Sequence, residues 1–298
     1  MELIIVGTVA LDDVKTPFGE VKAALGGSAT YAAFAASHFA KPGIVSVVGE
    51  DFPKQHLDLL EKRGIDLKGL KKEGKTFRWG GFYEFDMNEA KTLRTELNSL
   101  ENFTPKLPDA YKKAKYVFLA NIDPSVQLAV LEQIENPSWV VTDTMNFWIE
   151  NKKDDVLKVI KKTNTLVLND GEARELFKTT NLVQAANKAL KLGPSSVIIK
   201  KGEHGALLFT KDKHFNAPGY PLENIKDPTG CGDAFGGAFI GHVANTKVHD
   251  EWNLRKAVMY GSTLASFNAE DFSLERLKKI KKEDIEKRLA EFRQMREF

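Results

Sequence analysis

Short apolar runs recur along the chain, and each is rich in β-branched or aromatic side chains. They occupy residues 3–6, 44–48, 116–119, 139–142, 165–168 and 197–199. Continuous apolar runs of this length are typical of parallel strands that are buried on both faces of a sheet. The pattern therefore predicts a buried sheet whose strands are spread over the first two thirds of the sequence.

Segments with helical spacing of apolar residues follow most of these runs. They cover residues 30–39, 53–63, 125–134, 154–162, 182–192, 234–244, 254–267 and 282–295. Strands that alternate with helices in this way are joined by right-handed crossovers, which place helices on both sides of the sheet. We therefore expect an α/β fold: a doubly wound, mostly parallel sheet covered on both faces.

The alternation of strands and helices is interrupted between residues 75 and 100. The ten residues 76–85 read TFRWGGFYEF and alternate aromatic with polar or small side chains, which predicts antiparallel strands with two different faces. Together with residues 11–25 they are expected to form a small β-sheet lid inserted within a single domain of residues 1–298. The aromatic lid strands either pair with those of a second copy, giving a homodimer, or cover a bound substrate.

Charge and composition narrow the classes of partner. The 298 residues are 42% hydrophobic and 28% charged, and 43 Lys and Arg nearly balance 41 Asp and Glu. A formal charge of +2 gives no general attraction for nucleic acid or for an anionic membrane, so the expected partners are small molecules. Cys231 is the only cysteine, and no signal peptide or membrane-spanning run is apparent, which favours a cytoplasmic setting.

A glycine-rich turn directly before an apolar helix carries the clearest chemical signal. Residues 227–235 read DPTGCGDAF. Glycines let the backbone approach a phosphate closely, and the N–H groups at a helix start point at the bound anion. Asp233 stands at the start of this helix, where a carboxylate either caps the helix or acts as a base.

The turn resembles the C-terminal signature of the ribokinase (PfkB-type carbohydrate kinase) family, Asp-Thr-x-Gly-Ala-Gly-Asp. Pro228 and Cys231 depart from that signature, while its remaining anchors are present. The resemblance implies an ATP-dependent kinase that transfers the γ-phosphoryl group to a hydroxyl of a sugar or of the ribose of a nucleoside. Gly230, Cys231 and Gly232 would then form an anion hole, and Asp233 would take the proton from the acceptor hydroxyl.

The resemblance extends to the acceptor side of the site. Asp12, after the first strand, matches a carboxylate that holds two sugar hydroxyls, although its neighbour Asp13 competes for that role. Gly26-Gly27 matches a pair of glycines that serves as a lid hinge and brings the backbone close to the substrate. Tyr31 stands where the family often has asparagine, so the pocket differs from that of a typical ribokinase. Tyr31 either stacks on a flat ligand or packs in the core.

On the nucleotide side, Asn169 and Glu172 match the Asn-x-x-Glu element that arranges Mg²⁺ near the ATP phosphates. The same spacing is also a helix capping box. Lys200 or Lys201 would face a phosphate, and Gly202 lies in the segment that lines the nucleotide. Asn169 is also expected near the bound ATP.

Some relatives hold a monovalent cation near positions like Asp227 and Ser273, which adds K⁺ to the implied cofactors ATP and Mg²⁺. A catalytically silent small-molecule sensor on the same fold is the alternative to a kinase. A dinucleotide enzyme is disfavoured because residues 7–10, GTVA, do not form a Gly-x-Gly-x-x-Gly turn.

The expected acceptor has a ribose-like ring with a primary hydroxyl. Asp12 suits a vicinal diol, and the chain offers more flat apolar surface than a free sugar needs: Tyr31 and the lid aromatics Phe77, Trp79, Phe82 and Phe85. A nucleoside is therefore at least as good a candidate as a free sugar, provided that one of the lid rings faces the pocket.

Overall fold

The computed structural model describes residues 1–297, and its main sheet contains nine strands. In chain order these are β1 (Leu3–Val6), β4 (Pro42–Val48), β5 (Asp66–Lys72), β8 (Tyr116–Leu119), β9 (Trp139–Thr142), β10 (Thr165–Asn169), β11 (Ser196–Lys200), β12 (Ala206–Thr210) and β13 (His214–Ala217). Their spatial order is β13-β12-β11-β10-β9-β8-β1-β4-β5. Every neighbouring pair is parallel except β11 with β12 and β12 with β13.

The central strands are apolar throughout because both of their faces are buried. In β1, Leu3 and Ile5 join one hydrophobic cluster, while Ile4 and Val6 join another on the opposite face. Successive side chains of a strand point to opposite faces, so an uninterrupted apolar run can supply two cores at once. The doubly wound, mostly parallel sheet predicted from the sequence is confirmed.

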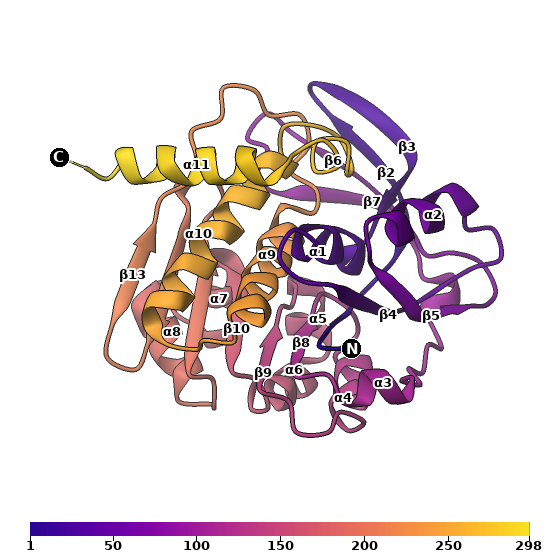
Figure 1. Ribbon diagram of the computed structural model, residues 1–298, viewed down its shortest axis with the longest axis horizontal. Helices are drawn as coiled ribbons and strands as arrows, with labels where there is room; N and C mark the ends of the chain where they lie inside the picture. The colour runs from indigo at the N-terminus through magenta and orange to yellow at the C-terminus, as the bar shows by residue number, and fades with distance from the viewer. Residues whose placement is uncertain (298) are drawn as a thin grey trace.

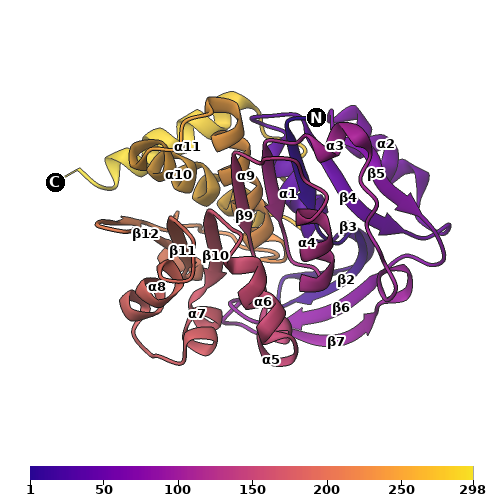
Figure 2. The ribbon, with the colours of Figure 1, turned by 90° about the horizontal axis from the view of Figure 1, so that it is seen from below.

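Helices cover both faces of the main sheet (Figures 1 and 2). One face carries α1 (Ser28–Ala36), α2 (Lys54–Lys62), α9 (Cys231–Thr246), α10 (Glu251–Asn268) and α11 (Lys282–Gln294). The other carries α3 (Asp109–Lys112), α4 (Pro124–Leu131), α5 (Asn146–Asn151), α6 (Lys153–Ile160), α7 (Asp170–Phe177) and α8 (Leu182–Leu190). Short 3₁₀ turns lie at Asn98–Leu100 and Gly202–His204.

A separate four-stranded sheet stands beside the main one, as Figure 2 shows. It consists of β2 (Ala10–Thr16), β3 (Gly19–Gly26), β6 (Arg78–Tyr83) and β7 (Ala90–Glu96), in the order β3-β2-β6-β7. The β2–β3 and β6–β7 pairs are antiparallel, whereas β2 and β6 run parallel. The alternating segment 76–85 and residues 11–25 therefore do meet in one small sheet.

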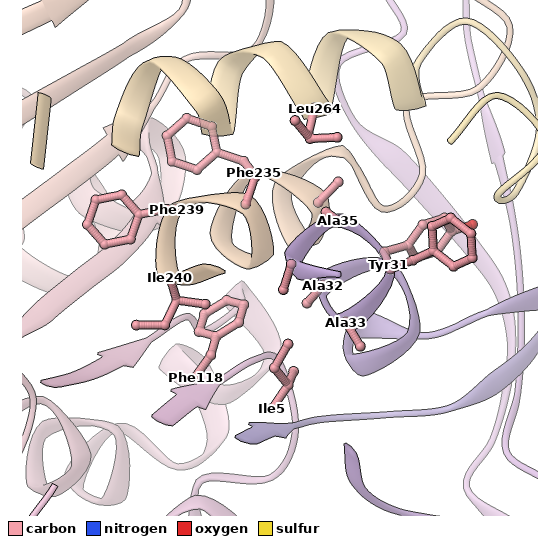
Figure 3. Close-up of a cluster of buried hydrophobic side chains, with 14 of the residues drawn as sticks. Ile5, Tyr31, Ala32, Ala33, Ala35, Phe118, Phe235, Phe239, Ile240 and Leu264 are labelled. Atoms are coloured by element: carbon pink, nitrogen blue, oxygen red, sulfur yellow. The ribbon is translucent and has the colours of Figure 1, made fainter. Parts of the chain in front are cut away.

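Small residues let α1 and α9 pack unusually closely, and this contact fixes where α9 begins. α1 is buried along its whole length and presents Ala32, Ala33 and Ala35 to the core (Figure 3). A side chain at Gly237 of α9 would overlap the backbone of Ala32. α10 packs against the other side of α9, with Leu264 near Phe235 in Figure 3. The start of α9 is thereby held rigidly above the sheet.

All six apolar runs form strands of the main sheet, and the eight segments with helical spacing contain helices. Three strands were not foreseen: β5, with four lysines and aspartates among its seven residues, and the β12–β13 hairpin at the sheet edge. No helix within residues 1–297 is long and apolar enough to cross a membrane.

Candidate active site

The turn before α9 is held in place by contacts from three sides. Gly230 precedes the helix with φ of 78°, a conformation that side chains disfavour. The ring of Tyr31 lies directly against Gly230, where it leaves no room for a β-carbon. Asn268 of α10 donates from Nδ2 to the carbonyl oxygen of Thr229 at 2.7 Å, and Asp227 Oδ1 accepts from the Thr229 N–H at 2.9 Å. These contacts fix the orientation of the backbone N–H groups at the start of α9.

Asp233 lies in the first turn of α9 with a strongly perturbed pKa. That pKa is raised to about 7, chiefly by burial and also by the Asp143 carboxylate, while the Lys200 ammonium opposes the rise. A carboxylate with a pKa near neutrality is well matched to accept a proton at physiological pH. The structure thus gives Asp233 the electrostatic setting of a general base.

Lys200 forms a buried ion pair beside the same turn. It ends β11 and donates from Nζ to Asp143 Oδ2 at 2.8 Å. A β-carbon added at Gly232 would lie 3.0 Å from the same Nζ, so the ammonium group is next to the glycine-rich turn. Of the two lysines considered from the sequence, Lys200 is therefore the one that reaches the candidate anion hole. Asp143 was missed, although a carboxylate directly after a parallel strand was an available signal.

Asn169 and Glu172 form the complete capping box at the start of α7. Asn169 Oδ1 accepts from the Glu172 N–H at 2.8 Å, and Glu172 Oε2 accepts from the Asn169 N–H at 2.6 Å. The Glu172 carboxyl also lies near Lys200, Asp143 and Asp233. Its pKa is raised to about 8, chiefly by burial and also by the two carboxylates, while the Lys200 ammonium opposes the rise. Capping and a place in the cluster are thus compatible at Glu172.

Asp12 and Asp13 point to opposite faces of the small sheet. The Asp12 carboxyl is buried beside Gly26 and accepts a hydrogen bond from the Gly27 backbone. Its pKa is raised to about 8, chiefly by burial and also by the carboxylates of Asp227 and Asp233, while the hydrogen bond from Gly27 opposes the rise. Asp13 instead accepts from Arg94 at 2.7 Å on the outer face. The structure thus brings Asp12, and not Asp13, toward the start of α9.

Tyr31 is in the core rather than on an open surface. Only 2% of it is exposed, and its ring supports Gly230 as described above. Burial raises the pKa of its hydroxyl, and so do the nearby charges of Asp12 and Asp227. The Tyr31 phenol therefore lies next to the carboxylates while its ring is occupied by packing.

The small sheet contacts both the glycine-rich turn and the loop after β11. Thr229 Oγ1 donates to the Tyr83 hydroxyl at 3.2 Å. A β-carbon at Gly202 would lie 2.8 Å from Asn88 Oδ1, which places the β6–β7 turn against the loop after β11. The inner face of the small sheet is defined by Asp12 and Tyr83, and it faces the glycine-rich turn.

Asp227 and Ser273 are neighbours behind that turn. The Ser273 backbone donates to the Asp227 carboxyl, whose pKa burial raises. Asp227 Oδ2 is buried without a hydrogen-bond partner among residues 1–297. In the same described part of the chain, no three His, Cys, Asp or Glu side chains are grouped so that they could hold a metal.

Comparison with known proteins assigns the family. The model of the pfkB family carbohydrate kinases matches residues 5–278. The chain belongs to this family. It is accordingly a phosphotransferase with an alcohol group as acceptor, a sugar or nucleoside kinase, and the kinase prediction made from the sequence is confirmed.

Named relatives include both nucleoside and sugar kinases. The chain is 29% identical over 247 residues to a cytidine kinase of Thermococcus kodakarensis, covering 80% of this chain and 87% of that protein. It is 25% identical over 297 residues to a 5-dehydro-2-deoxygluconokinase of Clostridium botulinum, covering 89% and 86%.

The fold matches solved structures over nearly the whole chain. A Methanocaldococcus jannaschii nucleoside kinase, described as an archaeal member of the ribokinase family, aligns with a TM-score of 0.78 at 22% identity, covering 98% of this chain and 99% of the other. A putative ribokinase II of E. coli in complex with ATP and Mg²⁺ aligns with a TM-score of 0.78 at 17% identity, covering 99% of each chain. These likenesses confirm the ribokinase-like fold with its small sheet.

Proposed function

We propose that this kinase transfers the γ-phosphoryl group of ATP to the primary hydroxyl of a nucleoside, with Asp233 as the base. The observation that carries the proposal is the pairing of Asp12 with Trp79 in the small sheet. Paired residues on adjacent strands point to the same face, so a carboxylate suited to a ribose diol has an indole beside it. A free sugar also needs the carboxylate but requires less flat apolar surface than a nucleoside base does. The cytidine kinase among the relatives agrees with this choice.

Trp79 is the lid aromatic best placed to stack on a base. Its ring lies over Gly81, whose lack of a side chain lets the indole lie flat, and its Nε1 donates to Thr92 Oγ1 at 3.2 Å. Phe82 alternates to the outer face and lies under the Lys91 ammonium, and Phe85 is 86% exposed beyond the end of β6. Trp79 would therefore form the wall for the base.

The transfer step follows from the groups around the start of α9. The Asp233 carboxylate takes the proton of the acceptor hydroxyl as that oxygen forms its bond to the γ-phosphorus. The bond from phosphorus to the β,γ-bridging oxygen breaks, and ADP leaves with that electron pair. The N–H groups of Gly230, Cys231 and Gly232, with the Lys200 ammonium, stabilise the charge on the transferring group. Gly202 and Asn169 flank the nucleotide in this proposal.

Magnesium fits the charge of the cluster behind the turn. Three carboxylates, those of Asp143, Glu172 and Asp233, surround the single ammonium of Lys200. The excess of negative charge and the all-oxygen donor set suit Mg²⁺, which keeps several waters and needs few protein ligands. Glu172 and Asp143 would hold the ion largely through water, with Asn169 positioning Glu172 through the capping box. When bound with ATP, the ion would neutralise phosphate charge.

A monovalent cation such as K⁺ is proposed beside Asp227 and Ser273. The unpartnered Asp227 Oδ2 supports this, since a buried carboxylate oxygen without a donor is costly unless a cation compensates it. Ser273 adopts φ of 53° next to it and directs its hydroxyl to the Leu25 carbonyl oxygen at 2.5 Å. The rate in KCl compared with tetramethylammonium chloride tests the assignment, and equal rates contradict it.

The small sheet would act as a lid and also as a dimer contact. Phe18, Phe85 and Leu93 of the small sheet and its turns expose 57%, 86% and 70% of their surface, and Phe85 and Leu93 line a hollow of about 900 Å³. Exposed apolar side chains gathered in this way suit pairing with the same sheet of a second copy. Light scattering of the unaltered protein and of Phe85→Ser tests this, and a monomer in both contradicts it.

Release of ADP from a panel of acceptors tests the proposed function. Cytidine, adenosine and inosine are compared with ribose, fructose and fructose 6-phosphate at equal concentrations. We expect a nucleoside to give the highest kcat/KM. Turnover of a free sugar with none of any nucleoside would overturn the nucleoside assignment and leave the kinase standing. No ADP release with any acceptor would favour the silent sensor.

A further inference from the structure

A second cavity lies at the opposite end of α9 from the catalytic cluster. It has a volume of about 560 Å³ and is enclosed by β13, the end of α9, the first half of α10 and the last turns of α11. At 1.5 Å per residue, the axial separation between Asp233 and the cavity residue Thr246 is about 20 Å. The volume is that of a typical small-molecule site, and no step of phosphoryl transfer uses it.

The walls of this distal cavity are largely aromatic. Trp252 is 71% exposed in the first turn of α10, an unusual position for so large an apolar side chain. Phe215 of β13 faces it, with the Arg255 guanidinium 4.9 Å from the Trp252 ring centroid and 5.3 Å from that of Phe215. Tyr260 and Phe292 complete the ring-bearing lining. The Arg255 guanidinium thus occupies the space between Trp252 and Phe215, and the Arg296 guanidinium lies 4.8 Å from the Phe215 ring centroid. The exposed indole of Trp252 is therefore the ring on which a planar group could stack.

The charge of the lining is entirely positive. It includes Arg255, Lys256, Arg293 and Arg296, and it contains no carboxylate among the described residues. Arg255 is paired with Glu251 of its own helix. Within residues 1–297, the other three cations have no carboxylate within ion-pair distance, and all three are exposed at the mouth. Like charges converging on one hollow favour an anion there.

The polar groups at the cavity floor are already satisfied. His242 Nε2 and Asn253 Oδ1 lie 3.0 Å apart, and Asn253 Nδ2 donates to Thr246 Oγ1 and to the Val248 carbonyl oxygen. The nearby Glu286 accepts from the Tyr260 hydroxyl at 3.1 Å and is not part of the lining. A ligand would thus meet a neutral floor, aromatic walls and a cationic mouth.

We propose that this distal cavity binds a small anion that carries a flat ring, with the ring against the exposed indole of Trp252 and the anionic group at Arg293 and Arg296. Nucleotides and aryl phosphates share this chemistry. Stacking on aromatic walls and charge-assisted hydrogen bonds to guanidinium groups are each effective in a partly desolvated site. The site is separate from the ATP and acceptor sites.

Calorimetric titration with 1-naphthyl phosphate tests the proposal, because this probe has the ring and the charge but is not a nucleoside. We expect it to bind the unaltered protein with Kd below about 1 mM. Arg293→Glu/Arg296→Glu should weaken binding at least tenfold, whereas the charge-matched control Lys161→Glu/Lys191→Glu, on the far side of the sheet, should not. Trp252→Ala should also weaken binding, and AMP should compete more strongly than adenosine.

Three results would overturn the proposed binding of an anion in the distal cavity. One is no detectable binding to the unaltered protein. Another is equal affinity in the arginine double variant and the lysine control. The third is loss of binding in Trp79→Leu but not in Trp252→Ala, which would assign the probe to the acceptor site. The KM for ATP of the arginine double variant should stay within about twofold of the unaltered value, since its side chains lie far from the catalytic turn.

Discussion

Asp12 of β2 and Trp79 of β6 are paired residues on adjacent strands, and their side chains share the inner face of the small sheet. The same face carries Tyr83, whose hydroxyl accepts from Thr229 in the catalytic turn. The carboxylate proposed to hold a diol and the ring proposed to stack on a base therefore lie on one face of the small sheet.

Asp12 and Asp13 offer a matched pair of variants. Above pH 8, where the Asp12 carboxyl is ionised, Asp12→Asn should raise the KM for the nucleoside by about 10- to 100-fold, because a hydrogen bond to a charged group contributes about 1.5–3 kcal/mol. Asp13→Asn removes only the Arg94 ion pair, in which 35% of the Asp13 side chain is exposed, and should change KM less than about threefold. Equal effects in steady-state kinetics would contradict the assignment of Asp12 to the acceptor.

Variants of Trp79 and Phe85 test whether Trp79 stacks on the nucleoside base. Trp79→Leu should raise the KM for the nucleoside about 10- to 100-fold, since stacking of a base on an aromatic contributes about 1–3 kcal/mol. The KM for ATP should change little. Phe85→Leu, at a side chain that is 86% exposed, is the control and should leave both KM values unchanged. A Trp79→Leu enzyme with normal nucleoside KM would show that the indole never meets the base.

Glu172→Gln tests the magnesium assignment. Glutamine can still cap α7 through its side-chain oxygen, so folding should be preserved, while one carboxylate is lost from the cluster around Lys200. We expect the magnesium concentration for half-maximal rate to rise several-fold, with a smaller change in acceptor KM. An unchanged magnesium titration would mean that Glu172 serves only as a cap.

The pH dependence of rate and stability should have opposite signs. Asp233 must be ionised to accept a proton, and its pKa is raised to about 7, so kcat/KM should rise with pH through about 7. Its raised folded pKa means that the folded form binds the proton more tightly than the unfolded chain does. The resulting stabilisation is present below the unfolded value of 3.8 and is lost as pH rises through about 7.

Initial rates and thermal unfolding measured between pH 5 and pH 8.5 check the predicted rise in rate and the predicted fall in stability. Asp12 and Glu172, with pKa values raised to about 8, add to the same loss of stability as pH rises. A Tm that increases over this interval would contradict the raised pKa values. A rate that falls from pH 6 to pH 8 would argue against Asp233 as the base.

Local sequence patterns could predict the catalytic turn, but contacts between distant segments could not be predicted. The turn from Asp227 to Asp233 is a continuous stretch, and its glycines report a backbone requirement directly. Asp143 directly follows a predicted strand, which was a local signal, but its ion pair with Lys200 could not be predicted, because Lys200 is 57 residues away on β11 and the two meet only once both strands lie in one sheet. The strand β5 was missed because much of it is polar and it lies at the sheet edge.

The sequence also could not predict which aromatic side chains of the small sheet lie on its inner face. Alternation predicted two faces, but which face met the site depended on the register of β2 with β6. That register places Trp79 beside Asp12 and Phe82 beside Lys15 on the other face. The distal cavity likewise arises from four elements, one of which, β13, has only one buried residue in its four-residue sequence. Neither feature leaves a local motif.

The most direct test of the account is the rate of nucleoside-dependent ADP release by Asp233→Asn and by the unaltered protein. Asparagine retains the size of the side chain and can still accept a hydrogen bond, so the variant should fold with an unchanged far-UV circular dichroism spectrum. Because a positioned base contributes about 10²- to 10⁴-fold, turnover should fall at least about 100-fold. A folded variant that retains turnover within a few-fold of the unaltered protein would contradict the account.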